Sequence, residues 1–114
     1  NVIAGYQWDV ISDPQWTATG LLVYLSGDVS VKLNTISGDG TDIGVAAYYS
    51  GTVNVQNNVI GRTPPGDGDI IDAYGIGVEF YGNGGKSKIV NNKFSGWATA
   101  FVGQDLSKNN VVTP

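Results

Sequence analysis

The chain of 114 residues contains no cysteine, no histidine and no methionine. Without cysteine, it can form neither a disulfide framework nor a thiolate metal site. Without histidine, it lacks the commonest general base and metal ligand at neutral pH. Any catalysis would therefore depend on carboxylates, lysine or tyrosine, and nothing in the composition requires a cofactor.

Charge is scarce as well, because only 14% of the residues are charged and the net charge is −4. This is too little charge for a surface of amphipathic helices. The six lysine and arginine residues are scattered along the chain, whereas a nucleic-acid-binding protein needs a dense basic face. No apolar run approaches the ~18 to 20 residues of a membrane-spanning helix. We therefore expect no nucleic acid as a partner and no membrane span.

What the chain does contain is 17 glycines, many valines and isoleucines, and a phrase that recurs. In this phrase an apolar-x-apolar segment is followed by asparagine and then by a second apolar segment. The asparagines that mark it are Asn1, Asn34, Asn58, Asn92 and Asn110. Self-similarity at intervals of a few tens of residues is typical of stacked repeats, so the pattern predicts a solenoid.

A second strand-forming phrase follows each asparagine turn and opens with glycine or alanine. Its copies are 20–25, 44–49, 75–80 and 100–104. Each repeat therefore predicts three short strands per turn, and the chain predicts one all-β solenoid domain, residues 1–114, of about four turns. Because the sequence begins and ends inside a repeat, we expect it to be an excised segment of a longer solenoid.

Alternation along the strands predicts inward columns of apolar side chains, since successive residues point to opposite faces. We align the copies on their opening residues, so that Gly75 matches Gly44. The resulting columns are Leu21, Val45, Ile76 and Phe101; Val31, Val55 and Ile89; and Ile36, Ile60 and Phe94. We expect the repeated asparagines to tolerate a left-handed backbone at a tight turn and to stack their amides into a ladder.

The order of apolar strand, asparagine turn, apolar strand, variable loop and glycine-opened strand resembles the right-handed parallel β-helix repeat of the pectate-lyase-like superfamily. The resemblance covers essentially the whole chain and implies a right-handed parallel β-helix. It implies much less about function, because lyases, hydrolases, epimerases, phage tailspikes and adhesins share this repeat. In that superfamily the glycine-opened strand and the adjoining loops commonly form a polysaccharide groove.

The repeats differ in length mainly before the glycine-opened strand, and solenoids often bind ligands where insertions gather. The outward residues of that strand would form the floor of a groove, and loop aromatics would form its walls. The predicted groove residues are Tyr24, Tyr48, Glu79, Gln104, Trp8, Trp16, Tyr74 and Trp97. Aromatic faces beside hydrogen-bonding groups suit a sugar ring. Alternatively, these aromatic residues pack the loops against the solenoid wall.

Acidic residues gather in two of the variable loops. The candidate metal ligands are Asp39, Asp42, Asp67, Asp69 and Asp72. Carboxylates from adjacent loops would supply part of the oxygen set that Ca²⁺ prefers, although Asp-Gly pairs also simply form turns. Glu79 is the candidate catalytic residue, paired with one of these aspartates as acid and base or nucleophile. The His- and Arg-containing signatures of pectin hydrolases and lyases are missing.

Three hypotheses for the function follow. The favoured one is a carbohydrate-directed, polysaccharide-binding module of a secreted or cell-surface protein. The first alternative is a non-catalytic structural or assembly module, such as a stalk, adhesin or spacer, whose open ends associate end to end. The second alternative is a fragment of a polysaccharide lyase or glycoside hydrolase.

Overall fold

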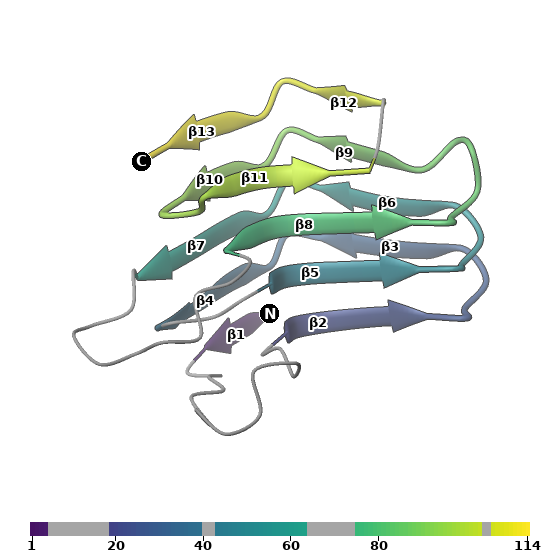
Figure 1. Ribbon diagram of the computed structural model, residues 1–114, viewed down its shortest axis with the longest axis horizontal. Helices are drawn as coiled ribbons and strands as arrows, with labels where there is room; N and C mark the ends of the chain where they lie inside the picture. Colours follow the sequence, from purple (N-terminus) through teal and green to yellow (C-terminus); the bar gives the residue numbers. More distant parts are fainter. Residues whose placement is uncertain (5–18, 40–42, 64–74, 104–105) are drawn as a thin grey trace.

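The computed structural model describes residues 1–4, 19–39, 43–63, 75–103 and 106–114, and these residues form thirteen short strands and no helix. The strands belong to three sheets in which neighbouring strands run parallel. Figure 1 shows the strands of each sheet stacked one above another. The all-β, parallel character predicted from the sequence is thereby confirmed.

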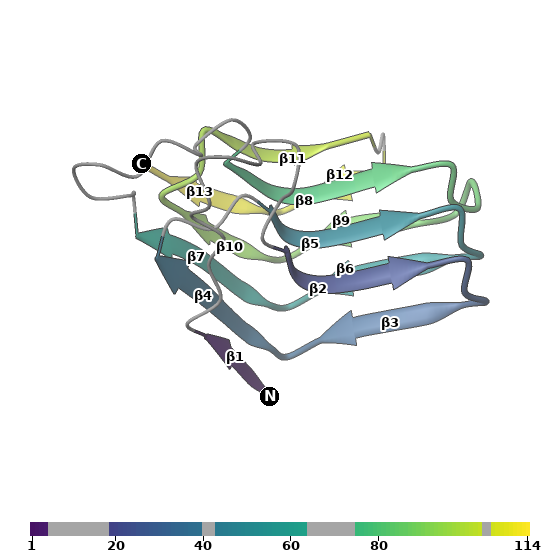
Figure 2. The ribbon, with the colours of Figure 1, turned by 60° about the horizontal axis from the view of Figure 1, so that its bottom comes forward.

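The chain visits the three sheets in a fixed order. Sheet A comprises β1 (Val2–Ala4), β4 (Thr35–Asp39), β7 (Val59–Thr63), β10 (Lys93–Ser95) and β13 (Val111–Thr113). Sheet B comprises β2 (Thr19–Tyr24), β5 (Ile43–Tyr48), β8 (Ile76–Tyr81) and β11 (Thr99–Val102). Sheet C comprises β3 (Val29–Lys32), β6 (Val53–Gln56), β9 (Lys88–Val90) and β12 (Ser107–Lys108). One strand from each of sheets A, B and C makes one turn of the chain, and each strand of the next turn pairs with the strand three places before it. This arrangement is consistent with a parallel β-helix (Figure 2).

Apolar columns between the sheets form the core. The two columns predicted in sheets C and A are confirmed by the register, and their side chains are almost completely buried. They are Val31, Val55 and Ile89, and Ile36, Ile60 and Phe94. Burial of such side chains contributes roughly 1.5 to 3 kcal/mol each, so these columns are a main source of stability.

The register of β8 in sheet B differs from the sequence prediction by two residues. Val45 pairs with Val78, whereas the prediction placed Ile76 in that column. A shift by two preserves the inward and outward alternation, but it gives every outward residue of β8 a different neighbour. Tyr48 therefore pairs with Tyr81, and Glu79 does not stand in the tyrosine column.

Two glycines, Gly75 and Gly77, lie where the glycine-opened strand of this turn begins. The register of β5 and β8 places Gly77 opposite Gly44. At both positions the backbone passes close to a side chain of sheet A. A Cβ on Gly44 would lie 2.8 Å from Ile60 Cγ2, and one on Gly77 would lie 2.7 Å from the Phe94 ring. Gly75 instead precedes β8 and has a positive φ of 52°.

A ladder of asparagines runs along the corner between sheets C and A, as predicted. Asn34, Asn58 and Asn92 each donate from the backbone N–H and from Nδ2 to the Oδ1 of the next asparagine, over 2.9 to 3.2 Å. The last acceptor is Asn110. The Nδ2 of Asn58 also donates to the Val31 carbonyl at 2.8 Å. Each rung thus satisfies a backbone donor and a backbone acceptor at a buried corner.

The left-handed residue at this corner precedes the ladder asparagine, which corrects the expectation that the ladder residue itself adopts that conformation. The residues with φ between 54° and 57° are Leu33, Asn57, Asn91 and Asn109. Asparagine tolerates this region, which explains why most rungs read Asn-Asn. Leu33 is the exception, and its side chain is 76% exposed.

Replacing Asn58 with leucine should lower the free energy of unfolding by about 3 kcal/mol or more, because the Asn34 N–H and the Val31 carbonyl lose their partners in the interior. Denaturant unfolding measures the change. Asn54→Leu is the matched control, since Asn54 Oδ1 is buried without a hydrogen-bond partner, so its replacement should not lower the free energy of unfolding. Equal losses in the two variants would contradict the structural role of the ladder.

Replacing Leu33 with asparagine should raise the free energy of unfolding by about 1 kcal/mol, because it relieves the left-handed strain of a leucine. Thermal or denaturant unfolding checks this. Leu33→Thr removes the same exposed apolar side chain but disfavours the left-handed region, so it should bring no gain. A gain for threonine equal to that for asparagine would show that surface hydrophobicity, and not backbone strain, sets the effect.

Candidate functional site

The corner between sheets B and C repeats the design of the asparagine corner with other residues. A left-handed residue is followed by a polar one in the pairs Leu25-Ser26, Tyr49-Ser50 and Gly82-Asn83. The Ser26 N–H donates to Ser50 Oγ, and the Ser50 N–H donates to Asn83 Oδ1, each at 3.1 Å. This second ladder fixes the backbone where the strands of sheet B end.

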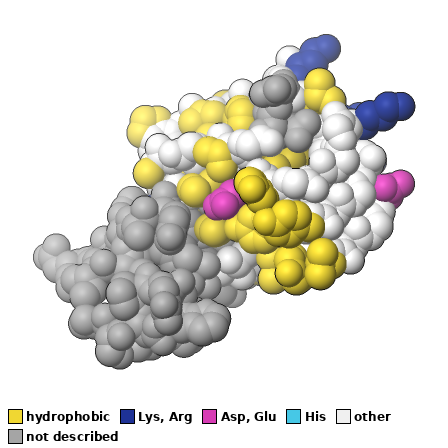
Figure 3. All heavy atoms as spheres, turned by 45° about the vertical axis from the view of Figure 1, so that its right-hand side comes forward, with side chains coloured by type: hydrophobic (Ala, Val, Ile, Leu, Met, Phe, Trp, Pro, Cys, Tyr) yellow, Lys and Arg dark blue, Asp and Glu magenta, His cyan; other side chains and the backbone are white. Residues whose placement is uncertain are grey.

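Exposed tyrosines gather at that end of sheet B. Tyr24, Tyr48 and Tyr81 are paired in register across β2, β5 and β8. We define the tyrosine patch as the exposed side chains of Leu22, Tyr24, Leu25, Tyr49 and Tyr81; Tyr48 beside them is half-buried. These are five of the eleven large hydrophobic side chains found exposed among the described residues, so the exposure is concentrated here. Figure 3 shows this face with its hydrophobic side chains in yellow.

Tyr49 lies at the centre of the tyrosine patch and orders its neighbours. Its ring meets the ring of Tyr24 edge to face at a centroid distance of 6.4 Å, and the ring of Tyr81 at 5.4 Å. A Cβ on Gly82 would lie only 2.7 Å from Tyr49 Cδ1, so the ring rests against the glycine backbone. The three rings therefore form a packed row rather than independent surface side chains.

The tyrosine patch is costly for stability in two ways. Leu25 and Tyr49 have φ values of 49° and 50°, a region that bulky residues rarely adopt. Both side chains are also more than half exposed, so little burial offsets the strain. Leu33 shares this strain and exposure, but at Leu25 and Tyr49 they coincide with the packed rings of the tyrosine patch, and this combination makes the patch the candidate site.

Glu79 lies on the same outward face of β8 as Tyr81, two residues before it. Its pairing partners are Ala46 and Val102, and its side chain is half-buried. The candidate carboxylate therefore flanks the tyrosine patch, although it does not continue the tyrosine row. Glu79 can accept hydrogen bonds from a ligand that lies on the patch.

Trp97 is not brought to the tyrosine patch. It is 9% exposed, belongs to the core cluster, and donates from Nε1 to the Ile60 carbonyl at 2.9 Å. The guanidinium of the buried Arg62 lies 5.9 Å from the centre of its ring. For this residue the structure supports the alternative in which the aromatic side chain packs against the solenoid.

The remaining predicted site residues lie outside the described residues. They are Trp8, Trp16, Tyr74 and Gln104 of the groove, and Asp42, Asp67, Asp69 and Asp72 of the metal site. Asp39 ends β4, and its side chain is likewise outside the described part. Within the described residues no group of three or more acidic side chains could hold a metal ion. The calcium site at these loops stays a prediction.

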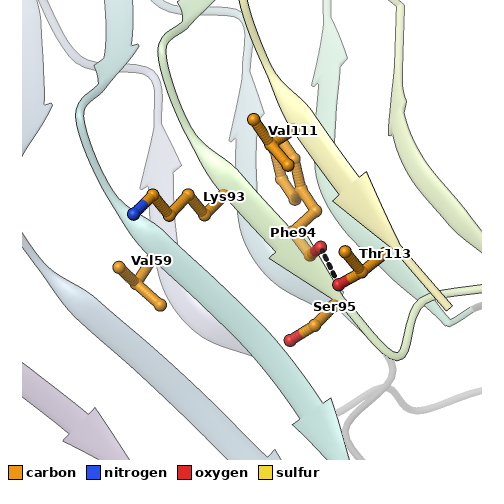
Figure 4. Close-up of a pocket in the computed structure, with 6 residues that line it drawn as sticks. All are labelled: Val59, Lys93, Phe94, Ser95, Val111 and Thr113. Carbon is orange, nitrogen blue, oxygen red and sulfur yellow. Dashed lines mark hydrogen bonds between the residues drawn. The ribbon is translucent and has the colours of Figure 1, made fainter.

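Two hollows lie away from the tyrosine patch on the described surface. One, of about 210 Å³ on the outer face of sheet A, is shown in Figure 4 with its lining residues Val59, Lys93, Phe94, Ser95, Val111 and Thr113. Its Thr113 hydroxyl is already bonded to the Phe94 carbonyl at 3.2 Å. The other, of about 380 Å³, lies on sheet C between Lys88 and Lys108. Neither hollow has an aromatic ring on an outward strand position, so the tyrosine patch is the stronger candidate.

Comparisons with protein-family models, with curated proteins and with solved structures found no match. In the part of the chain that the structure describes, no helix is long and apolar enough to cross a membrane.

Sequence reasoning missed Tyr49 and Tyr81 as site residues. Tyr49 was passed over because alternation assigns it inward after Tyr48, whereas the left-handed turn at this residue rotates its side chain outward. Tyr81 was displaced by the two-residue register error. The second ladder is the sequence signal for both residues. Ser26, Ser50 and Asn83 each come two residues after a strand-end tyrosine, namely Tyr24, Tyr48 and Tyr81, and Tyr49 directly precedes Ser50.

A double-mutant cycle on Tyr49 and Tyr81 should give a coupling free energy of about 0.5 to 1.5 kcal/mol, the value of an edge-to-face ring pair. Denaturant unfolding of Tyr49→Ala, Tyr81→Ala and the double variant measures it. The cycle on Leu33 and Tyr81, which lie at different corners and share no ring contact, serves as the control and should show coupling near zero. Comparable coupling in both cycles would mean that the value for Tyr49 and Tyr81 does not report their ring contact.

Proposed function

We propose that this protein is a carbohydrate-binding module of a secreted or cell-surface protein, and that it holds a polysaccharide on the tyrosine patch. The proposal includes a right-handed parallel β-helix of about four turns, of the pectate-lyase-like kind. The observation that carries it is the group of exposed, mutually packed tyrosines Tyr24, Tyr49 and Tyr81 at the end of sheet B, with Tyr49 at a left-handed backbone position.

The chemistry of the tyrosine patch suits a sugar chain. A pyranose ring has apolar C–H faces and a rim of hydroxyls, and a tyrosine offers a flat ring with a hydrogen-bonding tip. Leu22 and Leu25 extend the apolar surface at its margin. The Glu79 carboxylate and the tyrosine hydroxyls supply acceptors and donors for sugar hydroxyls. Rings that are already packed lose little conformational entropy on binding, which favours affinity.

We propose binding and not catalysis because the strands of sheet B supply only one carboxylate. Hydrolysis of a glycosidic bond generally uses two carboxyl groups, separated by ~5 to 9.5 Å. Among the strands of sheet B, Glu79 is the single acidic residue. The hydrolase or lyase alternative requires a partner from the aspartates outside the described residues, and turnover of a polysaccharide abolished by Glu79→Gln would establish it.

The experiment is a screen of immobilised polysaccharides followed by isothermal titration calorimetry on any that bind. Tyr49→Ala should weaken the affinity about tenfold or more, the equivalent of losing one stacked ring. Leu33→Ala is the matched control, because Leu33 is also an exposed apolar residue with a left-handed backbone but lies at the opposite corner. It should leave the affinity unchanged.

Two results would count against the proposal. If Leu33→Ala lowers the affinity as much as Tyr49→Ala does, the polysaccharide does not bind specifically at the tyrosine patch. Absence of glycan binding, combined with concentration-dependent oligomers in analytical ultracentrifugation that Tyr49→Ala abolishes, would favour the assembly-module alternative. Both variants should first be shown to unfold cooperatively.

A further inference from the structure

The basic residues of this protein lie outside the described strands of sheet B. Lys32, Lys88 and Lys108 belong to sheet C, and Lys93 belongs to sheet A. Lys86 lies in the turn between β8 and β9. The sixth cation, Arg62, is buried in sheet A beneath the surface. In a chain with net charge −4, the lysines therefore belong to sheets A and C and to the turn from β8 to β9, and the buried guanidinium of Arg62 lies beside Gly75 at the start of β8.

Sheet B has the opposite character. The strands that the structure assigns to it contain Glu79 and no lysine or arginine. The segments that connect sheet A to sheet B, residues 5–18, 40–42 and 64–74, contain aspartates and again no lysine or arginine in their sequence. Figure 3 shows one acidic side chain against the hydrophobic patch, while the basic side chains lie apart at the margin of the view.

From this separation we infer that the ligand of the tyrosine patch is an uncharged polysaccharide, and that uronic-acid or sulfated polysaccharides are excluded. The inference rests on the proposed function. Recognition of a repeated carboxylate or sulfate needs arginine or lysine donors, and the patch has none. A polyanion would also bring its charges beside Glu79, whereas a neutral chain keeps only the stacking contacts and hydroxyl hydrogen bonds.

Calorimetry with matched oligosaccharides tests the inference. The neutral probes are hexasaccharides of β-1,4-linked glucose, xylose and mannose, and the acidic probes are hexasaccharides of galacturonate and guluronate. The best neutral probe should bind at least about tenfold more tightly than either acidic probe, since one like-charge contact near the surface is sufficient for that ratio. Its affinity should vary by less than about twofold between low and high salt, because screening acts only on charges.

Three variants locate the binding site. Tyr49→Ala should abolish the preference for neutral over acidic hexasaccharides, because it lowers the affinity for the neutral probe. The double variant Lys88→Gln with Lys108→Gln should leave neutral binding unchanged, because these lysines line the hollow on sheet C. Glu79→Gln should narrow the gap between neutral and acidic probes by removing the repelling charge while keeping a hydrogen-bonding group.

The outcomes separate the inference from the proposed function. Tighter binding of an acidic probe that Tyr49→Ala weakens would overturn the inference and leave carbohydrate binding at the patch intact. Acidic binding that only the double lysine variant removes, with no neutral binding, would place the site on sheet C and overturn both. A lack of binding to every probe, and to the polysaccharides of the wider screen, would refute the proposed function itself.

Discussion

The constraint on which this structure depends is the satisfaction of backbone polar groups at its sharp corners. Between strands the sheets' hydrogen bonds are interrupted, yet the corners pass close to the core. Two ladders solve the problem, one of asparagines beginning at Asn34 and one of Ser26, Ser50 and Asn83. In each ladder a side-chain oxygen accepts a hydrogen bond from a backbone N–H of the preceding turn. The corner N–H groups therefore gain their partners only when one turn stacks on the next.

The sequence predicted those parts of the fold that repeat with the same residue type. The asparagine rungs and the columns through Val55 and Ile60 follow from identical phrases, and the structure confirms them. The register of β8 could not be read in this way, because Gly75 and Gly77 both fit the opening position. The approach of Gly77 to the Phe94 ring distinguishes them, and that contact joins residues from different sheets; within the sequence, the alignment of Ser50 with Asn83 gives the same register.

The candidate site was predicted less completely than the fold. Sheet B and Tyr24 with Tyr48 were identified from alternation, whereas Trp97, predicted as a loop aromatic in the groove wall, is packed in the core, as the alternative expected. A tryptophan in a short turn carries no signal for which side of the chain it will occupy. Tyr49 escaped notice because a left-handed turn overrides alternation, and backbone conformation at a non-glycine residue is set by the neighbouring turns rather than by its own preference.

The asparagine ladder has a single direction, because every rung donates toward the next turn and accepts from the previous one. Each interior turn therefore presents donors to the turn that follows and an acceptor to the turn that precedes it, so a duplicated turn could be inserted without designing a new contact. Such a duplication would also add one tyrosine to the row on sheet B. The number of repeats would then set the number of linked contacts with a ligand chain, so that avidity could be tuned by duplication alone, without change to any individual contact.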